Sequence, residues 1–272
     1  MVISQNNATT IEKTLTSIVT QDCPVSFEII LVNCGTDKTV EIAQAHFPHI
    51  RTVKLNEPAL PGRARNAGVK ISQGDYLSFP SAHIELAPGS LRARVKAHQK
   101  GYAMVSGAMV NGTLTSAGWA SYFVDHSEAM PLAPSKPLQK PPSSCSYEKN
   151  ALNQSGLFPE DRRAGEDTFV NQALWDLGYR AYRNNKIILK HRSRCTTAWA
   201  LACHHFVRGR AYGQILFENE KREKALLGYT RNRFNFIEGN VAKWGGEMRN
   251  SLREISPLGL VGSRQRADWC LF

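Results

Sequence analysis

Apolar positions in the first half of the chain follow two spacings, one typical of helices and one typical of buried strands. Ile11, Leu15 and Ile18 recur at helical spacing within residues 9–20. Phe27 to Val32 is apolar at every position except Glu28, which is typical of a strand covered on both faces. The alternation continues with predicted helices over 40–47, 62–72 and 89–99 and predicted strands over 51–55, 76–79 and 103–110. This β-α-β-α order predicts an α/β fold with a mainly parallel, doubly wound sheet and helices on both faces.

The second half of the chain is less regular. Residues 131–144 hold five of the thirteen prolines, so we expect a loop there. We expect a helix over 166–177, and after Thr196 a long amphipathic helix. The apolar face of that long helix consists of Trp199, Ala202, Cys203, Phe206, Gly213 and Leu216. We therefore predict one α/β domain over 1–194 and a helical extension over 195–272.

Charge is unevenly distributed along the chain. Residues 1–179 hold 16 Lys or Arg and 16 Asp or Glu, whereas residues 180–272 hold 18 and 7, so the whole net charge of +11 falls in the last third. The six cysteines form no CxxC pair, which indicates a reduced chain rather than a disulfide or zinc framework. No apolar run approaches the roughly 18 residues of a membrane-spanning helix, and no basic-then-apolar leader opens the chain. These features predict a cytoplasmic protein.

Polar side chains follow several of the predicted strands, at Ser4 to Asn7, at Asn33 and at Ser81 to His83. Ligands of open α/β sheets collect at the carboxyl ends of strands, so these positions are candidates for a binding site. The chain has no GxGxxG after its first strand and no GxxxxGK[ST] anywhere. A dinucleotide-binding or P-loop protein is therefore disfavoured.

Two adjacent carboxylates, Glu166 and Asp167, open the helix predicted at 166–177. One interpretation is structural, because acidic residues suit the positive end of a helix. The other is chemical, because an ionised carboxylate can act as a general base toward a hydroxyl group.

The segment PGRARNAG at 61–68 places Arg63, Arg65 and Asn66 in the first turn of another helix. Cations are unfavourable at the positive end of a helix. A bound diphosphate would justify their position, and an ordinary solvated helix start is the alternative.

Five segments in order give the chain a resemblance to the family 2 glycosyltransferases, which have the nucleotide-sugar-binding GT-A fold. The resemblance covers roughly residues 1–220. The segments are Ser4-Gln5-Asn6-Asn7-Ala8, Val32-Asn33-Cys34-Gly35-Thr36, Ala64-Arg65-Asn66-Ala67-Gly68, the run from Gly74 to His83, and Gly156-Leu157-Phe158 through Gly165-Glu166-Asp167-Thr168.

The resemblance implies an inverting transfer of a sugar from a nucleotide diphosphate, with a UDP-sugar favoured, to a hydroxyl acceptor. It implies Asp167 as the base, with Glu166 beside it, and Asn33 facing the nucleobase. The implied donor pocket comprises Ser4, Asn6, Asn7, Asn33, Gly35, Arg63, Arg65, Asn66, Ser81 and His83. The QxxRW motif of processive synthases is absent, so a single-addition enzyme of polysaccharide or cell-envelope biosynthesis is expected.

The sequence departs from the family where the Asp-x-Asp motif holds Mg²⁺ or Mn²⁺, because this chain has Ser81-Ala82-His83 there. His83 and His191 remain candidate ligands, and imidazole suits Mn²⁺ better than Mg²⁺. We expect metal dependence to be weakened or lost, with cations such as Arg63, Arg65, His191 or Arg192 stabilising the leaving diphosphate. The alternative is a catalytically inactive relative that binds a nucleotide-sugar or a partner protein.

The basic last third can contact nucleic acid, anionic lipid or a diphosphate, or can be a solvated face. Its aromatic residues Trp199, Phe206 and Tyr212 lie on the apolar face of the predicted helix, where core packing is the favoured use, so we expect no nucleic-acid partner. Attachment to an anionic membrane, near a lipid-linked acceptor, is the favoured interpretation. Met1 to Ile3 leave only a stub of the first strand, which indicates either an incomplete N-terminus or a weakened sheet.

Overall fold

The computed structural model describes residues 1–56, 59–142 and 145–218. Contacts divide the chain into two units, Met1–Ile215 and Leu216–Phe272. The description below concerns the first unit and the helix that leaves it. Beyond residue 218, the basic extension expected over 195–272 lies outside the described residues.

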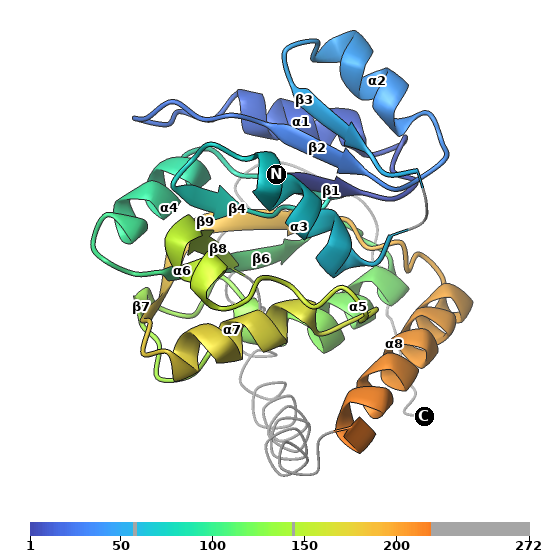
Figure 1. The fold of residues 1–272 in the computed structure, drawn as a ribbon. Coiled ribbons are helices and arrows are strands. Elements are labelled where there is room, and N and C mark those ends of the chain that lie inside the picture. The colour runs from blue at the N-terminus through green and yellow to red at the C-terminus, as the bar shows by residue number, and fades with distance from the viewer. Residues whose placement is uncertain (57–58, 143–144, 219–272) are drawn as a thin grey trace, which may run out of the picture. The chain divides into compact units, whose positions relative to one another are not determined.

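The first sheet has three parallel strands in the order β1-β2-β3. Its central strand is buried along its whole length, and Val2 lies opposite Leu31 in the register. Three helices follow the three strands, so this part of the chain has the predicted β-α-β-α order (Figure 1). The elements are β1 (Val2–Ser4), α1 (Ile11–Val19), β2 (Ile30–Asn33), α2 (Thr39–His46), β3 (Arg51–Lys54) and α3 (Pro61–Ile71).

The second predicted strand begins later than its apolar run. Strand β2 starts at Ile30, whereas Phe27 is 42% exposed, so the expectation of a strand over 27–32 is wrong at its N-terminal end. Pairing explains the difference, because β1 starts at Val2 opposite Leu31 and β3 starts at Arg51 opposite Ile30. Ile29 O still accepts a 3.0 Å hydrogen bond from the N–H of Arg51, and the regular strand pairing ends there.

The second sheet is mixed rather than mainly parallel. Its strands run in the order β4-β8-β6-β9-β5, with β7 also paired to β9, and only the β6–β9 pair is parallel. The antiparallel pairs join segments that are far apart in the sequence, such as Leu77 with Tyr147 and Ile84 with His191, so the order of local elements does not reveal them. The strands are β4 (Tyr76–Ser78), β5 (Ile84–Leu86), β6 (Met104–Asn111), β7 (Lys136–Pro137), β8 (Cys145–Glu148) and β9 (Ala181–His191). Strand β7 lies within the predicted proline-rich loop.

The two sheets meet at the N-terminal strand. Ala82 N–H donates to Ile3 O over 3.0 Å, and the Met1 ammonium donates to Ser78 O over 2.8 Å. The first bond brings the end of β1 beside the segment that follows β4, and the second joins the residue before β1 to the last residue of β4. The helices of this part are α4 (Ser90–His98), α5 (Ser116–His126), a 3₁₀ turn at Ser127–Ala129, α6 (Lys149–Gln154), α7 (Glu166–Asp176) and α8 (Ala198–Glu218).

Helix α8 forms where a long amphipathic helix was predicted, but its aromatic side chains do not pack into the core. Trp199 is 78% exposed and Phe206 is 75% exposed. The expectation of core packing is therefore wrong for these two residues. Tyr212 lies in α8, but its side chain is outside the described part. None of the helices described has the length and the hydropathy that crossing a bilayer requires.

Candidate functional site

A cavity of about 420 Å³ lies where the second sheet meets the start of α7. Its size falls within the roughly 300–1,000 Å³ that small-molecule sites occupy. Strands β5, β6 and β9, helices α5, α7 and α8 and the segment after β4 contribute to its lining. Five of the predicted site residues line it together: Ser81, His83, Glu166, Asp167 and His191.

The acidic pair reaches this cavity because Gly165 reverses the chain just before α7. Gly165 has a φ of 79°, a left-handed conformation that glycine adopts without steric cost. Glu166 is buried and forms an ion pair with Arg65 of α3. The guanidinium of Arg65 also lies 5.1 Å from the centre of the Phe158 ring, within the range of a cation–π contact. The charge of Glu166 is therefore balanced inside the protein.

Asp167 has a carboxylate whose pKa is raised to about 6. Burial is the largest cause and the charge of Glu166 adds to it, while Arg65 acts in the opposite direction. Its Oδ1 accepts a 2.9 Å hydrogen bond from the N–H of Thr168. At neutral pH this group is mostly ionised, yet it binds a proton more strongly than an ordinary carboxylate does.

Helix α3 holds the loop that leads to the acidic pair. Asn66 Nδ2 donates to Phe158 O and to Glu160 Oε1, both over 2.8 Å, and its Oδ1 accepts from Phe158 N–H over 3.1 Å. Arg63, in contrast, is exposed and is not part of the cavity lining. In the predicted helix start, Arg65 and Asn66 are thus the residues that hold α7 and the segment before it in place.

His83 and His191 face each other in the cavity lining, with their Nε2 atoms 3.2 Å apart. The pKa of each imidazole is lowered to about 3. Burial is the main cause for both rings, followed by His191 for the first and by His126 for the second. Both rings are therefore neutral at pH 7, and neither supplies a positive charge in the unliganded protein.

Two imidazole nitrogens at this separation can share one ion, because metal–nitrogen bonds are about 2.1 Å long. Among the described residues, however, no group of three or more His, Cys, Asp or Glu side chains is suited to hold one. The pair also lacks the oxygen ligands that Mg²⁺ prefers. His83 and His191 alone therefore do not fit a protein-held Mg²⁺ and are too few for a stable Mn²⁺ site.

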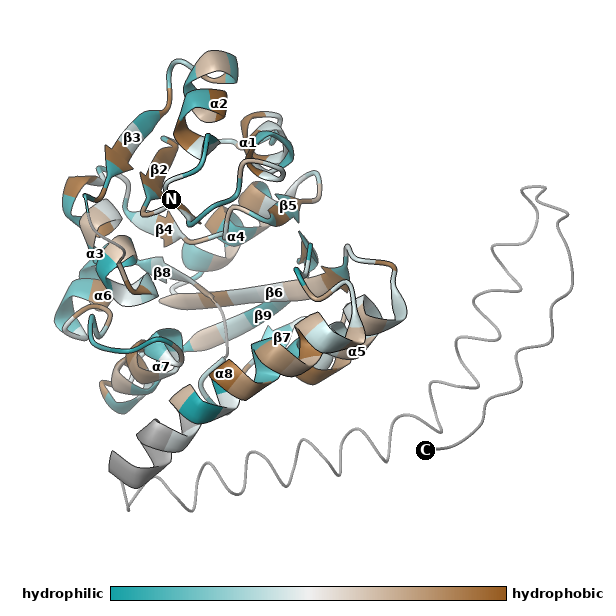
Figure 2. Ribbon diagram, turned by 90° about the vertical axis from the view of Figure 1, so that its right-hand side faces the viewer, coloured by the Kyte–Doolittle hydropathy of each residue, from teal (hydrophilic) through white to brown (hydrophobic). Residues whose placement is uncertain are grey.

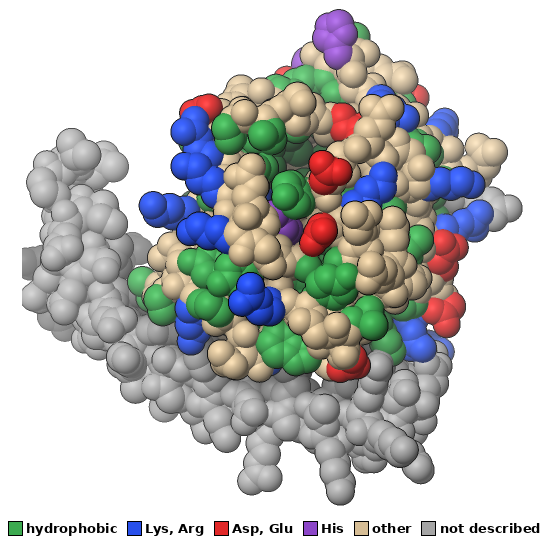
Figure 3. Space-filling view, turned by 60° about the vertical axis from the view of Figure 1, so that its left-hand side comes forward, with side chains coloured by type: hydrophobic (Ala, Val, Ile, Leu, Met, Phe, Trp, Pro, Cys, Tyr) green, Lys and Arg blue, Asp and Glu red, His purple; other side chains and the backbone are tan. Residues whose placement is uncertain are grey.

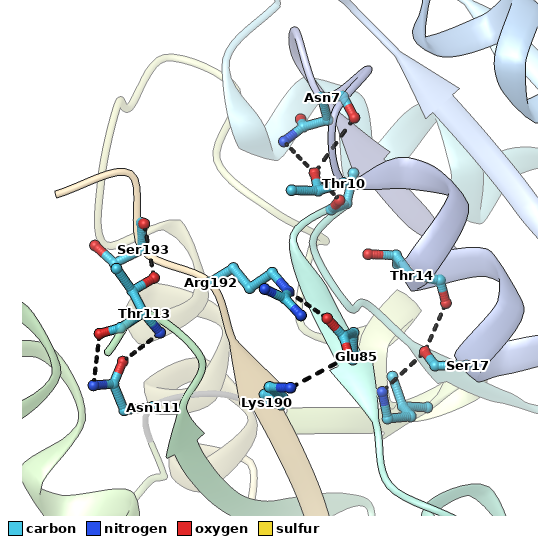
Figure 4. A network of polar contacts seen from close by, with 12 residues as sticks. Asn7, Thr10, Thr14, Ser17, Glu85, Asn111, Thr113, Lys190, Arg192 and Ser193 are labelled. Atoms are coloured by element: carbon cyan, nitrogen blue, oxygen red, sulfur yellow. Dashed lines mark hydrogen bonds and ion pairs between the residues drawn. The ribbon is translucent and has the colours of Figure 1, made fainter. Parts of the chain in front are cut away.

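The predicted donor-binding residues at the ends of β1 and β2 mostly form hydrogen bonds within the protein. Ser4 is buried, and its Oγ donates to Asn7 Oδ1 over 3.3 Å. Asn7, also buried, holds the start of α1 with its backbone oxygen and contacts Thr10 with its side chain (Figure 4). Asn33 is 1% exposed, and its amide donates to Gly35 O over 3.0 Å. In this conformation Asn33 is turned toward its own loop, so it does not face an open nucleobase site.

Asn6 and Gly35 form a close contact between these two loops. Asn6 has a φ of 56°, and its Oδ1 accepts from the N–H of Thr36 over 2.9 Å. A Cβ on Gly35 would lie 2.4 Å from Asn6 N, so only glycine fits there. The loops after β1 and β2 are thus fixed against each other.

Several residues near the cavity escaped the sequence analysis. Arg194 Nη2 donates to Gln5 O and Asn6 O over 2.7 and 3.0 Å, so the segment after β9 ties down the loop after β1. Asp125 of α5 and Arg208 of α8 line the cavity, 3.5 Å apart between Oδ1 and Nη1. In the sequence, the basic run from His191 to Arg194 directly after a strand was the signal that could have indicated the contacts of Arg194.

Arg192 and Arg65, two cations expected to stabilise a diphosphate, are both engaged in ion pairs. Arg192 pairs with Glu85, which Lys190 Nζ also approaches to 3.7 Å (Figure 4). Arg65 pairs with Glu166. The arginines that line the cavity are Arg163, Arg183 and Arg208, and Arg208 is itself paired with Asp125.

A second cavity, of about 730 Å³, lies between the first sheet, the segment around Gln73 and helix α4. The buried side chains of Arg94 and His98 lie in its lining. Figure 3 shows a face of the molecule that is hollowed near its middle, with basic and acidic side chains interspersed around the hollow. This larger cavity contains none of the predicted site residues.

Comparison with known proteins matches residues 1–154 to the model of glycosyl transferase family 2. The succinoglycan biosynthesis protein ExoO of Rhizobium meliloti (strain 1021) is 29% identical over 98 residues, which are 35% of this chain and 28% of that protein. The uncharacterized glycosyltransferase YibD of Escherichia coli (strain K12) is 37% identical over 75 residues, or 26% of this chain and 22% of that protein. The chain thus matches less than a third of either relative's length.

Solved structures of S. aureus TarS 1-349 share the fold. The complex with UDP has a TM-score of 0.58 at 18% identity, covering 71% of this chain and 59% of that one. The complex with UDP-GlcNAc has a TM-score of 0.56 at 18% identity, covering 71% and 57%. The predicted GT-A fold is confirmed, with flanking helices and a second sheet that is mixed. Since the family model spans more than half of the chain, this protein belongs to glycosyl transferase family 2.

Proposed function

We propose that this chain is an inverting, non-processive glycosyltransferase that moves a sugar from a UDP-sugar to a hydroxyl acceptor. The observation that carries the proposal is the common cavity of Asp167, Ser81 and His83. The TarS structures with UDP and UDP-GlcNAc support a uridine nucleotide as the leaving group. The relative ExoO is named as a succinoglycan biosynthesis protein, which supports a role of this chain in making polysaccharide or cell-envelope material.

In the proposed reaction, Asp167 accepts the proton of the acceptor hydroxyl while that oxygen attacks the anomeric carbon. The new C–O bond forms as the bond to the UDP oxygen breaks, on the opposite side of the sugar, which inverts the configuration. A pKa of about 6 suits this role, because a base works best when its pKa lies near the working pH. Glu166, held by Arg65, is a positioning residue that fixes the first turn of α7.

We further propose that cations of the chain, rather than a divalent ion, balance most of the charge on the leaving diphosphate. Arg163, Arg183 and Arg208 line the cavity, and Arg194 lies close enough to depress the pKa of His83. Preorganised cations in a partly dry site stabilise developing negative charge strongly. A lipid-linked acceptor at the inner face of an anionic membrane belongs to the same proposal, supported by the basic last third of the chain.

A second candidate is a protein that binds a nucleotide-sugar without transferring the sugar. The contacts of Asn33 favour it, because this buried side chain is turned into its own loop. The replacement of the acidic motif by Ser81-Ala82-His83 has the same implication.

Replacement of Asp167 by Asn separates the candidates. We expect Asp167→Asn to lower the rate of UDP release from UDP-sugars by at least about 100-fold, with a membrane lipid extract as acceptor. Asp176→Asn, at the exposed end of the same helix, removes the same charge and should keep wild-type activity. UDP binding, measured by calorimetry, should persist in both variants.

The outcomes are distinct. Full activity of Asp167→Asn would exclude this residue as the base, and UDP binding without any turnover by the wild type would favour the second candidate. Turnover that is unchanged in EDTA would support the cationic mechanism, whereas turnover restored only by Mn²⁺ would make His83 and His191 metal ligands.

A further inference from the structure

Helix α8 presents an apolar face that the rest of the described chain does not cover. Trp199 is 78% exposed and Phe206 is 75% exposed, and the smaller Ala202 and Cys203 between them are also exposed. At 3.6 residues per turn these four side chains lie on one side of the helix. Leaving two large aromatic side chains in water is unfavourable, so an interaction surface is the natural explanation.

The opposite side of α8 belongs to the candidate active site. His204, Arg208 and Ala211 line the cavity that contains Asp167. An ion pair between Arg208 and Asp125 of α5, 3.5 Å apart, holds this side of α8 against the domain. Helix α8 is therefore a wall with the candidate site on one side and the apolar face on the other.

Helix α5, the neighbour of α8, has further exposed apolar side chains. Figures 1 and 2 both show α5 and α8 side by side, and Figure 2 shows apolar residues on both helices. Of the twelve large apolar side chains that are exposed among the described residues, six lie on these helices or at the start of α5. They are Leu114, Trp119, Val124, Trp199, Phe206 and Val207, and Val207 also lines the cavity. We refer to Trp199 and Phe206, with Ala202 and Cys203 between them, as the α8 face.

Exposed arginines accompany this face, in a part of the chain that is rich in basic residues. From Arg180 to Glu218 the chain has eight Lys or Arg and a single Asp or Glu. Arg210 lies one turn beyond Phe206 on the same side of α8, and Arg194 precedes the helix; both are exposed. An aromatic face with a cationic border complements the surface of an anionic bilayer, where Trp and Phe side chains enter the headgroup region and basic side chains contact the headgroups.

We propose that the α8 face docks on an anionic membrane surface, with Trp199 and Phe206 as its apolar anchors. The inference deepens the proposed function, on which it rests for one consequence. Because the cavity lies on the other side of α8, docking holds the base within reach of a lipid-linked acceptor. The structure thus assigns the membrane contact to a defined surface of the folded domain rather than to basic charge alone.

Co-sedimentation with lipid vesicles tests this assignment. The full chain should bind vesicles made of phosphatidylcholine and phosphatidylglycerol. It should bind vesicles of phosphatidylcholine alone much more weakly. The double variant Trp199→Ala/Phe206→Ala should bind the anionic vesicles at least about tenfold more weakly, because two aromatic side chains no longer enter the bilayer. A matched control, Val19→Ala/Leu177→Ala, removes two exposed apolar side chains elsewhere and should bind as the wild type does.

A second readout places the anchor directly. Brominated acyl chains should quench part of the tryptophan fluorescence of bound wild-type protein, and Trp199→Phe should reduce that quenching while vesicle binding persists. Equal vesicle binding by the double variant and the wild type would overturn the proposal, and so would equal binding to neutral and anionic vesicles.

Other occupants of the face give other results. If a second copy of the chain covers it, the double variant will change a dimer into a monomer without lipid. If residues 219–272 cover it, the double variant will lower the melting temperature of the free protein by several degrees. Either result would contradict the proposal. UDP binding by the double variant reports on the donor site separately, so a failure of the proposed function remains distinguishable from a failure of the docking surface.

Discussion

Asp167 is a carboxylate in surroundings that disfavour its charge. Burial and the neighbouring Glu166 raise its pKa from 3.8 to about 6, so the folded protein binds this proton more tightly than the unfolded chain does. Between about pH 4 and pH 6, the stability contributed by this group is therefore lost as the pH rises. At neutral pH the ionised base is present at a cost in stability, as is common for catalytic groups.

This cost has a measurable pH dependence. We expect the acidic limb of kcat/KM to fall with an apparent pKa near 6 rather than near 4, because the base must be ionised. Asp167→Asn should melt a few degrees higher than the wild type at pH 7, and the difference should shrink toward pH 4. An acidic limb of kcat/KM near pH 4, together with an unchanged melting temperature of Asp167→Asn, would show that the pKa of the Asp167 carboxylate is not raised.

The ion pair of Arg65 with Glu166 offers a second test at this scale. Arg65→Met leaves Glu166 buried without its partner, which should lower the free energy of unfolding in urea by about 3–5 kcal/mol. Arg65→Met/Glu166→Gln should recover much of that loss. For comparison, Arg51→Met breaks the more exposed pair with Glu28 and should cost about 1 kcal/mol or less. Equal losses of unfolding free energy for Arg65→Met and Arg51→Met would contradict the assignment of Arg65 and Glu166 as a buried ion pair.

Single residues also show what a sequence can and cannot indicate. The carboxylates at 166–167 could be found, because an acidic pair at a helix start is visible in the sequence itself. The direction in which Asn33 points could not be found, since it depends on a bond to Gly35 O and on neighbours that bury it. Likewise, Arg65 was expected to bind an anionic ligand, and its anion is a side chain about one hundred positions away.

At the scale of elements, α3 packs against the loop that leads to the candidate site and holds it in place. A Cβ on Gly62 would lie 1.8 Å from Pro159 O, in the loop that leads to α7. Gly62→Ala should therefore push that loop away, costing about 1–3 kcal/mol of stability and lowering turnover. Gly209→Ala in α8 meets nothing within 4 Å and should be neutral or slightly stabilising, because alanine favours the helix. Urea unfolding and UDP release of the two variants check this contrast.

Most predicted helices and strands lie close to their expected bounds, and the errors concern strands whose partners the sequence does not reveal. A helix makes its backbone hydrogen bonds within one segment, so α1, α3, α4 and α7 begin and end within about two residues of their predicted bounds. A strand needs a partner, and the start of β2 was set by β1 and β3. The amphipathic pattern of α8 predicted an apolar face, but no pattern within one helix indicates whether another element covers that face.

The whole molecule brings together groups that no single motif contains. The cavity takes its lining from segments that are spread along the chain from Ser81 to Ala211. Five ordered motifs indicated the fold, since they mark consecutive α/β units. The mixed second sheet, the short strand β5 and the contribution of α8 depended on long-range pairing, which the order of motifs does not specify.

The central claim is that the nucleotide-sugar site is the cavity where α7 meets the segment after β4. A crystal structure of the protein soaked with UDP and Mn²⁺ tests it most directly. The account predicts the diphosphate of UDP beside Ser81 and His83, with the carboxylate of Asp167 facing the same space. UDP bound in the larger cavity beside α4 instead, with the acidic pair remote from it, would contradict the account.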